Sequence, residues 1–264
     1  MSIIEAIVLG IVQGLTEFLP VSSSGHLLIL QDWLGLEGNG LTFDVALHLG
    51  TLFALLLYFW NDLTRLITAS SKPGKERRLL LLLGLATLPA GVLGYLLENA
   101  AESTFRSPLL VAINLSVFGA LMLAAEAFAK RYSQPREILN ISRKQALIMG
   151  FAQSLAIVPG VSRSGSTITA GLAAGLDRIA ATRFSFLLGI PIIAGAAAKV
   201  LLSSEGLAAV RADKDIFAIG ITTAFLSGLL AIKFMLSYLA KHDLSVFAYY
   251  RFVVAGIIIL ALVV

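Results

Sequence analysis

Residues 158–165 read Val-Pro-Gly-Val-Ser-Arg-Ser-Gly and interrupt an apolar stretch that runs from Gln145 to Leu176. A second apolar stretch, from Ile3 to Leu36, is interrupted at residues 19–26, which read Leu-Pro-Val-Ser-Ser-Ser-Gly-His. Proline, glycine and serine end helices and begin new ones. Each half is about 10 to 17 residues long, which is marginal for crossing a bilayer. We therefore expect two re-entrant helical hairpins, whose irregular backbone is tolerated where protein or a polar cavity satisfies it.

The two interruptions are related to each other. Gly10–Gly25 aligns without gaps on Gly150–Gly165 at an offset of 140, with seven of 16 positions identical. The identities include the polar and glycine positions, which chance matches between apolar helices do not favour. The pattern predicts an internal duplication within one membrane domain, residues 1–264, with halves at about 1–130 and 140–264.

The composition is typical of an integral membrane protein. The chain is 58% hydrophobic and 14% charged, with a mean hydropathy of +0.89, whereas soluble domains carry about 25% charged residues. The absence of cysteine excludes disulfides, thiolate zinc sites and cysteine nucleophiles. The expected fold class is an all-α integral membrane protein with six transmembrane helices and the two hairpins. The six spans are predicted at residues 45–60, 79–98, 107–128, 182–202, 216–239 and 246–264.

Charged loops predict the orientation of these spans. Residues 61–78 and 129–144 each hold five Lys or Arg residues, so both loops should be cytoplasmic. Residues 32–44 and 98–106 hold five acidic residues and one arginine, so they should lie outside. Orientation accounts for the net charge of +4, and we expect no nucleic-acid partner. The hairpins then enter from opposite sides as an inverted-topology repeat, and their polar turns meet near the midplane.

The first hairpin carries one group of chemically active residues. Gln13 and Glu17 are four apart and share a helical face, and a carboxylate in an apolar segment is a functional candidate by default. The serines of Ser22–Ser24 can cap the next half-helix, whose free N–H groups attract anions. Ser22 and Ser23 lie four and three residues before His26, so a serine hydroxyl and the imidazole could form an activated nucleophile. The alternative is that these serines only cap the helix.

The second hairpin contributes a buried cation. Arg163 is the only charged residue between Lys144 and Asp177, and its planar fork of donors suits phosphate. Flanking glycines and serines allow backbone N–H groups to approach the same anion. The alternative is a structural salt bridge from Arg163 to Glu17 without a ligand.

A carboxylate beside a diphosphate would repel it. A divalent cation that bridges Glu17 and the phosphate oxygens removes this conflict. Asp44 and His48, which are four residues apart at the start of the first predicted span, form a second, weaker set of candidates. Asp44 is also well placed to cap that helix.

These motifs resemble those of the undecaprenyl-diphosphatase family, the bacitracin-resistance proteins of bacterial inner membranes. The family motif (E/Q)-x-x-x-E is met by Gln13 and Glu17, and P-V-S-S-[ST]-G-H by residues 20–26. The motif P-G-x-S-R-S-x-x-T is met by residues 159–167, and the similarity runs over nearly the whole chain. Many relatives have glutamate at the position of Gln13, so its neutral amide should be neither the essential base nor a strong metal ligand.

The resemblance implies an enzyme that removes the terminal phosphate of undecaprenyl diphosphate, recycles the lipid carrier of cell-wall glycans and confers bacitracin resistance. It implies a polyprenyl diphosphate lipid substrate, a surround of membrane lipid, Mg²⁺ or Ca²⁺ as cofactor with Glu17 as ligand, and a site that opens to the periplasm from the inner membrane. A homodimer is left open by the sequence. The expected catalytic residues are Glu17, Ser23, His26 and Arg163; the expected phosphate-binding residues are Gln13, Ser22, Ser24, Gly25, Ser162, Ser164, Gly165 and Thr167.

The residues leave three mechanisms open. Ser23 can attack phosphorus with His26 as base and later acid, His26 can attack directly, or a metal-activated water can attack. Other functions also fit inverted repeats with broken helices. A secondary transporter or lipid flippase shares this architecture, and a receptor for a phospholipid headgroup would bind without turnover.

Overall fold

The computed structural model describes residues 1–36, 40–97, 105, 107–132 and 137–263. Within these residues the regular structure is helical throughout. The α-helices are α1 (Ile3–Phe18), α2 (Ser23–Trp33), α3 (Gly40–Tyr58), α4 (Trp60–Thr68), α5 (Lys75–Leu96), α7 (Pro108–Tyr132), α8 (Arg143–Ser154), α9 (Arg163–Ala173), α10 (Arg178–Leu201), α11 (Ser204–Ala212), α12 (Lys214–Leu239) and α13 (Ser245–Val263). Short 3₁₀ turns lie at Ala69–Ser71, Ile138–Asn140 and Leu155–Ile157.

Five of the described helices are long and apolar enough to cross a membrane by themselves: α5, α7, α10, α12 and α13. They correspond to five of the six predicted spans. The remaining span, predicted at residues 45–60, is met by α3 only together with α4, from which it is separated by a bend of 70°. The chain is therefore a multi-pass membrane protein with five or six candidate spans. The predicted outer segment 98–106 lies almost entirely outside the described residues. Residues 37–39 of the other predicted outer segment and residues 133–136 of the second basic loop also lie outside them.

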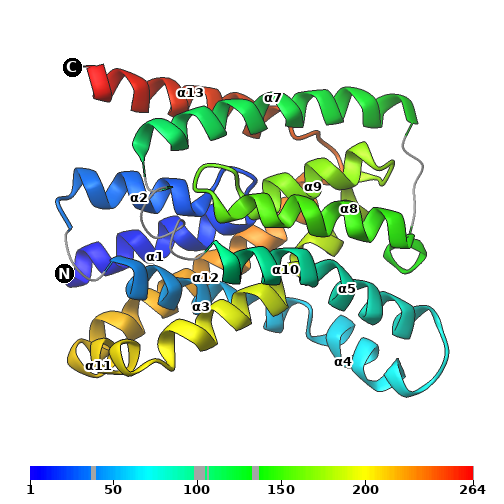
Figure 1. The fold of residues 1–264 in the computed structure, drawn as a ribbon, viewed down its shortest axis with the longest axis horizontal. Helices are drawn as coiled ribbons and strands as arrows, with labels where there is room; N and C mark the ends of the chain where they lie inside the picture. The colour runs from blue at the N-terminus through cyan, green and yellow to red at the C-terminus, as the bar shows by residue number, and fades with distance from the viewer. Residues whose placement is uncertain (37–39, 98–104, 106, 133–136, 264) are drawn as a thin grey trace.

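Both interrupted stretches form helical hairpins, and their turns meet (Figure 1). In that view α1 and α2 enter from the left and return to the left, whereas α8 and α9 enter from the right and return to the right. Capping sets the start of each hairpin. Ser2 forms a capping box with Glu5 before α1, and Ser142 forms one with Gln145 before α8, again at an offset of 140 residues.

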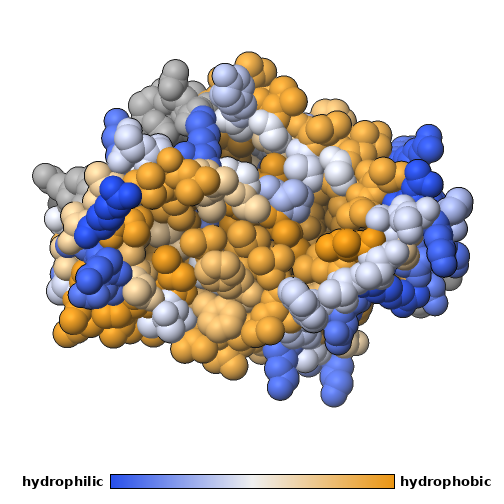
Figure 2. Space-filling view, turned by 90° about the horizontal axis from the view of Figure 1, so that it is seen from below, coloured by the Kyte–Doolittle hydropathy of each residue, from blue (hydrophilic) through white to orange (hydrophobic). Residues whose placement is uncertain are grey.

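The remaining helices surround these hairpins. Helix α1 packs against α12, α12 against α3, α13 against α7, and α5 against α8. Glycine permits the close approach of α1 and α12, since a Cβ on Gly14 would lie 2.5 Å from the carbonyl oxygen of Ala224. Apolar residues cover the middle of the face in Figure 2, and hydrophilic residues gather mostly toward its two ends. Such a belt is expected where lipid covers the middle of the protein.

Candidate active site

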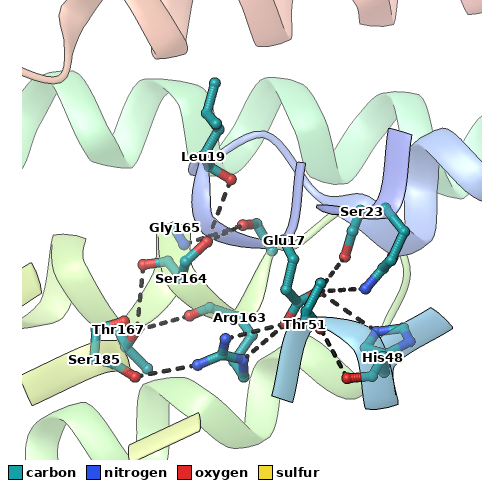
Figure 3. Close-up of polar contacts among 12 residues, drawn as sticks. Glu17, Leu19, Ser23, His48, Thr51, Arg163, Ser164, Gly165, Thr167 and Ser185 are labelled. Atoms are coloured by element: carbon teal, nitrogen blue, oxygen red, sulfur yellow. Dashed lines mark hydrogen bonds and ion pairs between the residues drawn. The ribbon is translucent and has the colours of Figure 1, made fainter. Parts of the chain in front are cut away.

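A carboxylate and a guanidinium meet where the two hairpin turns converge. Arg163, the first residue of α9, donates from Nη2 to Glu17 Oε1 at 3.0 Å and from Nε at 3.3 Å. Glu17 comes from the last turn of α1 and is 5% exposed. Figure 3 shows the guanidinium directed at the carboxylate from the neighbouring hairpin. Opposite charges in an apolar setting are expected to pair, because an isolated buried charge is costly.

The other carboxylate oxygen contacts a hydroxyl. Ser23 Oγ donates to Glu17 Oε2 at 2.6 Å, and Gln13 Nε2 donates to the same oxygen at 3.1 Å. His48 Nε2 lies 3.5 Å from it. The other ring nitrogen of His48, Nδ1, is 2.7 Å from the backbone oxygen of Asp44. A carbonyl only accepts, so Nδ1 carries the proton and Nε2 faces the carboxylate.

The same local backbone forms both turns. Ser22 and Ser162 precede α2 and α9 with φ of 76° and 74°, and they are the only non-glycine residues with positive φ among those described. Their hydroxyls cap the helices by accepting from the backbone N–H groups of Gly25 and Gly165, at 3.3 and 3.0 Å. This left-handed conformation is uncommon for serine. The serine in this conformation is the N-cap of the helix that follows, so that Ser23 and Arg163 become the first residues of their helices.

The two turns are bonded to each other. Ser22 Oγ accepts from Gly160 N at 3.1 Å, and Ser164 Oγ donates to the carbonyl of Leu19 at 3.3 Å. The two hairpin turns therefore converge, as the sequence predicted.

His26 occupies a different position from the predicted one. Its Nδ1 lies 2.7 Å from the backbone oxygen of Ser22, and its Nε2 lies 2.8 Å from the hydroxyl of Tyr250, on which the ring also stacks. Nδ1 must donate to the carbonyl, so the lone pair on Nε2 accepts from Tyr250. The predicted contact of the imidazole with the hydroxyl of Ser22 or Ser23 is wrong. The geometry instead gives Ser23 a carboxylate partner, Glu17.

A cavity of about 260 Å³ opens beside these groups. Its polar wall combines Glu17, Ser23 and Arg163 with other residues of the turns and of α3 and α8. Its apolar wall comes from α3, α5, α10 and the 3₁₀ turn after α8. The lining residues are Glu17, Ser23, Ser24, Val45, His48, Ala90, Gly94, Gln153, Ala156, Ile157, Ser162, Arg163, Ile192, Ile193 and Ala196. A larger cavity of about 420 Å³ lies between α4, α5 and α10 and is lined by none of these residues.

The predicted phosphate-binding residues divide into two groups. Ser24 and Ser162 line the cavity. The other predicted residues support the turns instead: Ser22, Gly25, Ser164 and Gly165 through the contacts given above, Gln13 through its bond to Glu17, and Thr167, whose hydroxyl lies 2.6 Å from that of Ser185. Of the weaker pair, His48 lines the cavity, whereas the side chain of Asp44 accepts from Gln31 at 2.6 Å.

Comparison with known proteins places the chain in a family. The family model for bacitracin resistance protein BacA matches residues 6–258. The chain belongs to the BacA family. Its relatives include proteins named undecaprenyl-diphosphatase from Thermodesulfovibrio yellowstonii, at 44% identity over 97% of this chain and 96% of the relative, and from Rubrobacter xylanophilus, at 46% identity over 98% and 97%. A third, from Desulforudis audaxviator, has the same name and is 45% identical over 94% and 93% of the two chains.

The donor set of this BacA-family site is suited to a particular kind of cation. No group of three or more His, Asp or Glu residues that could hold a metal by themselves occurs in the described residues. Among the residues that the structure describes, Glu17 is the only carboxylate that lines the cavity. Such a set fits a hard cation that completes its coordination with water and substrate phosphate oxygens, as Mg²⁺ commonly does.

Two residues that the motifs did not single out also shape the BacA-family site. Gly189 of α10 makes room for the guanidinium, since a Cβ there would lie 2.1 Å from Nη1 of Arg163. Arg251 of α13 is fully buried and donates to the carbonyls of Pro20, Gly160 and Val161, at 3.1, 2.7 and 3.0 Å. It thereby links the two turns. An arginine inside a predicted span was the sequence signal that could have found it.

Proposed function

We propose that this protein hydrolyses undecaprenyl diphosphate to undecaprenyl phosphate and inorganic phosphate. The reaction recycles the lipid carrier for cell-wall glycans and underlies bacitracin resistance. The observation that carries the proposal is the 2.6 Å hydrogen bond from Ser23 Oγ to Glu17, in a cavity that Arg163 also lines. The printed activity of relatives that align over nearly the whole chain supports the same reaction.

In the proposed mechanism Ser23 is the nucleophile and Glu17 is the base. As the hydroxyl oxygen attacks the terminal phosphorus, its proton passes to Glu17 Oε2. The bond from that phosphorus to the bridging oxygen breaks, and undecaprenyl phosphate leaves. Glu17 gives its proton to the departing phosphate and then accepts one from the water that attacks the phosphoserine. In this second step the bond from Oγ to phosphorus breaks and inorganic phosphate leaves. Glu17 returns its proton to Oγ, which restores the serine hydroxyl and the carboxylate.

Arg163 neutralises charge on the transferred phosphoryl group. Its bonds to Glu17 and to the carbonyl of Ser185 use three of its five N–H groups, as far as the described residues go. The remaining two N–H groups would donate to phosphate oxygens in the cavity. The first isoprene units would lie on the apolar wall that Val45 and Ile192 help to form.

A divalent cation, Mg²⁺ or Ca²⁺, belongs to the proposal as well. Glu17, whose carboxylate lines the cavity, would hold it together with the substrate. The cation would offset the negative charge of the diphosphate. A chelator should then abolish phosphate release, and added Mg²⁺ or Ca²⁺ should restore it.

The proposed membrane arrangement has two re-entrant hairpins in an inverted-topology repeat in the bacterial inner membrane. The cavity residues Val45 and Gly94 lie near the start of α3 and the end of α5. The basic loop 61–78 connects the opposite ends of these helices. Because that loop should be cytoplasmic, the cavity opens toward the periplasm.

Phosphate release from undecaprenyl diphosphate by the purified protein in detergent tests the function. A transporter or a headgroup receptor would release none. Ser23→Ala and Glu17→Gln should each lower turnover by roughly 10³-fold or more, the scale of losing a nucleophile or its base. Gly84→Ala is the control, since Gly84 lies outside the cavity and a Cβ there would meet nothing within 4 Å. If Ser23→Ala kept wild-type turnover, direct attack by water would replace the serine mechanism.

A further inference from the structure

Gln153 is a buried amide that faces the candidate site without a partner. It lies on α8, lines the cavity that Glu17, Ser23 and Arg163 also line, and is 2% exposed. Neither Nε2 nor Oε1 has a hydrogen-bond partner among the residues that the structure describes. Buried polar groups in proteins are nearly always bonded, because an unpaired one keeps the full cost of its lost hydration. An unpaired amide that lines the cavity of the candidate site therefore indicates that a ligand supplies the missing hydrogen bonds.

The alignment of the two interrupted stretches accounts for the missing protein partner of this amide. Gln153 is the counterpart of Gln13, which donates to Glu17 from the same helix at 3.1 Å. At the position that corresponds to Glu17, the second hairpin has Ile157. The second hairpin therefore has the amide donor, but the residue four positions later is apolar and offers no acceptor.

We propose that Gln153 is a substrate-binding residue, whose Nε2–H donates to a non-bridging oxygen of the lipid diphosphate. Its Oε1 accepts from a water or a phosphate hydroxyl in the same cavity. The inference rests on the proposed function, because the substrate of that function supplies the anion that the amide would bind. A neutral donor adds a hydrogen bond to the diphosphate while leaving the charge balance of Glu17 and Arg163 unchanged.

The first test is Gln153→Met, which keeps the length of the side chain and removes both polar atoms. If the amide serves only the substrate, the thermal midpoint of the purified protein stays equal or rises, because an unpaired buried amide is gone. At the same time kcat/KM for undecaprenyl diphosphate falls by about ten- to a hundredfold, the range for a hydrogen bond to a charged group. Inhibition by inorganic phosphate weakens in parallel.

A second variant adds a pH readout that a packing role would not produce. Gln153→Glu places a carboxylate against the diphosphate at neutral pH, so its loss should exceed that of Gln153→Met. Protonation restores a neutral donor of the same length, so its activity relative to wild type should rise as pH falls.

Thr169→Val is the matched control. Thr169 is also buried with an unpaired Oγ1 within the described chain, but it does not line the cavity. Its replacement should leave turnover unchanged. A wild-type protein that releases no phosphate from undecaprenyl diphosphate would contradict the proposed function. An active wild type with an equally active Gln153→Met, or a Gln153→Met that melts well below wild type, would overturn the role of Gln153 alone.

Discussion

Arg251→Met tests whether a single buried guanidinium holds the two hairpin turns in place. The wild-type side chain donates to carbonyls of both turns, at Pro20, Gly160 and Val161, and to two further carbonyls of α7. The turn carbonyls lie outside regular helices, and within the described residues Arg251 is the donor that satisfies them. Methionine fills similar space but donates nothing.

The magnitude follows from these acceptors. Each buried acceptor left unpaired costs about 1–3 kcal/mol, so three cost roughly 3–9 kcal/mol. Removing the guanidinium also recovers several kcal/mol of desolvation penalty. We expect a net loss of about 3 kcal/mol in the free energy of unfolding, concentrated at the turns.

Three measurements on purified protein check this expectation. Turnover should fall by about a hundredfold or more, because the turns position Ser23 and Arg163. The thermal midpoint should drop, and amide hydrogen exchange should accelerate at residues 19–26 and 158–165. Arg183→Met is the matched control, because Arg183 is 32% exposed and pairs with Asp62 near the surface, where an ion pair contributes only about 0–1 kcal/mol. Wild-type stability and turnover in Arg251→Met would refute the reasoning.

Two further predictions concern the site and its orientation. Gly189→Ala should lower kcat by about tenfold or more, because the new Cβ displaces the guanidinium of Arg163. Gly195→Ala on the same helix should leave kcat unchanged, because a Cβ there meets nothing within 4 Å. Equal rates for the two variants would contradict the close approach of Gly189 and Arg163. Because the chain has no cysteine, Asp32→Cys and Ser70→Cys provide single thiols at the two ends. In intact cells an impermeant thiol reagent should label the first and not the second, and the reverse pattern would invert the proposed topology.

Much of the architecture could be predicted from the sequence, because membrane insertion imposes local rules. Length and hydropathy predicted the spans, and Pro, Gly and Ser predicted the interruptions at residues 19–26 and 158–165. The pairing of Glu17 with Arg163 was offered as the alternative to a phosphate-binding arginine, since two opposite charges in apolar stretches have few other partners. The membrane orientation and the inverted repeat stay predictions.

The contacts within the site depended on backbone geometry that spacing does not reveal. The positive φ of Ser22 directs α2 so that Ser23 faces Glu17 while His26 faces Tyr250 of α13. Helical spacing alone suggested that His26 and the serine hydroxyls would meet.

By itself, then, the sequence determined which segments are apolar and where they break, since these properties depend on composition and short-range conformational preference. It also determined which charges lie in apolar segments and therefore need a partner. Only the tertiary structure decided that Glu17 and not His26 accepts from Ser23, that Gly189 leaves space for Arg163, and that Gln153 lies unpaired at the cavity. Those contacts join residues distant in the chain, and their geometry depends on how several helices pack at once.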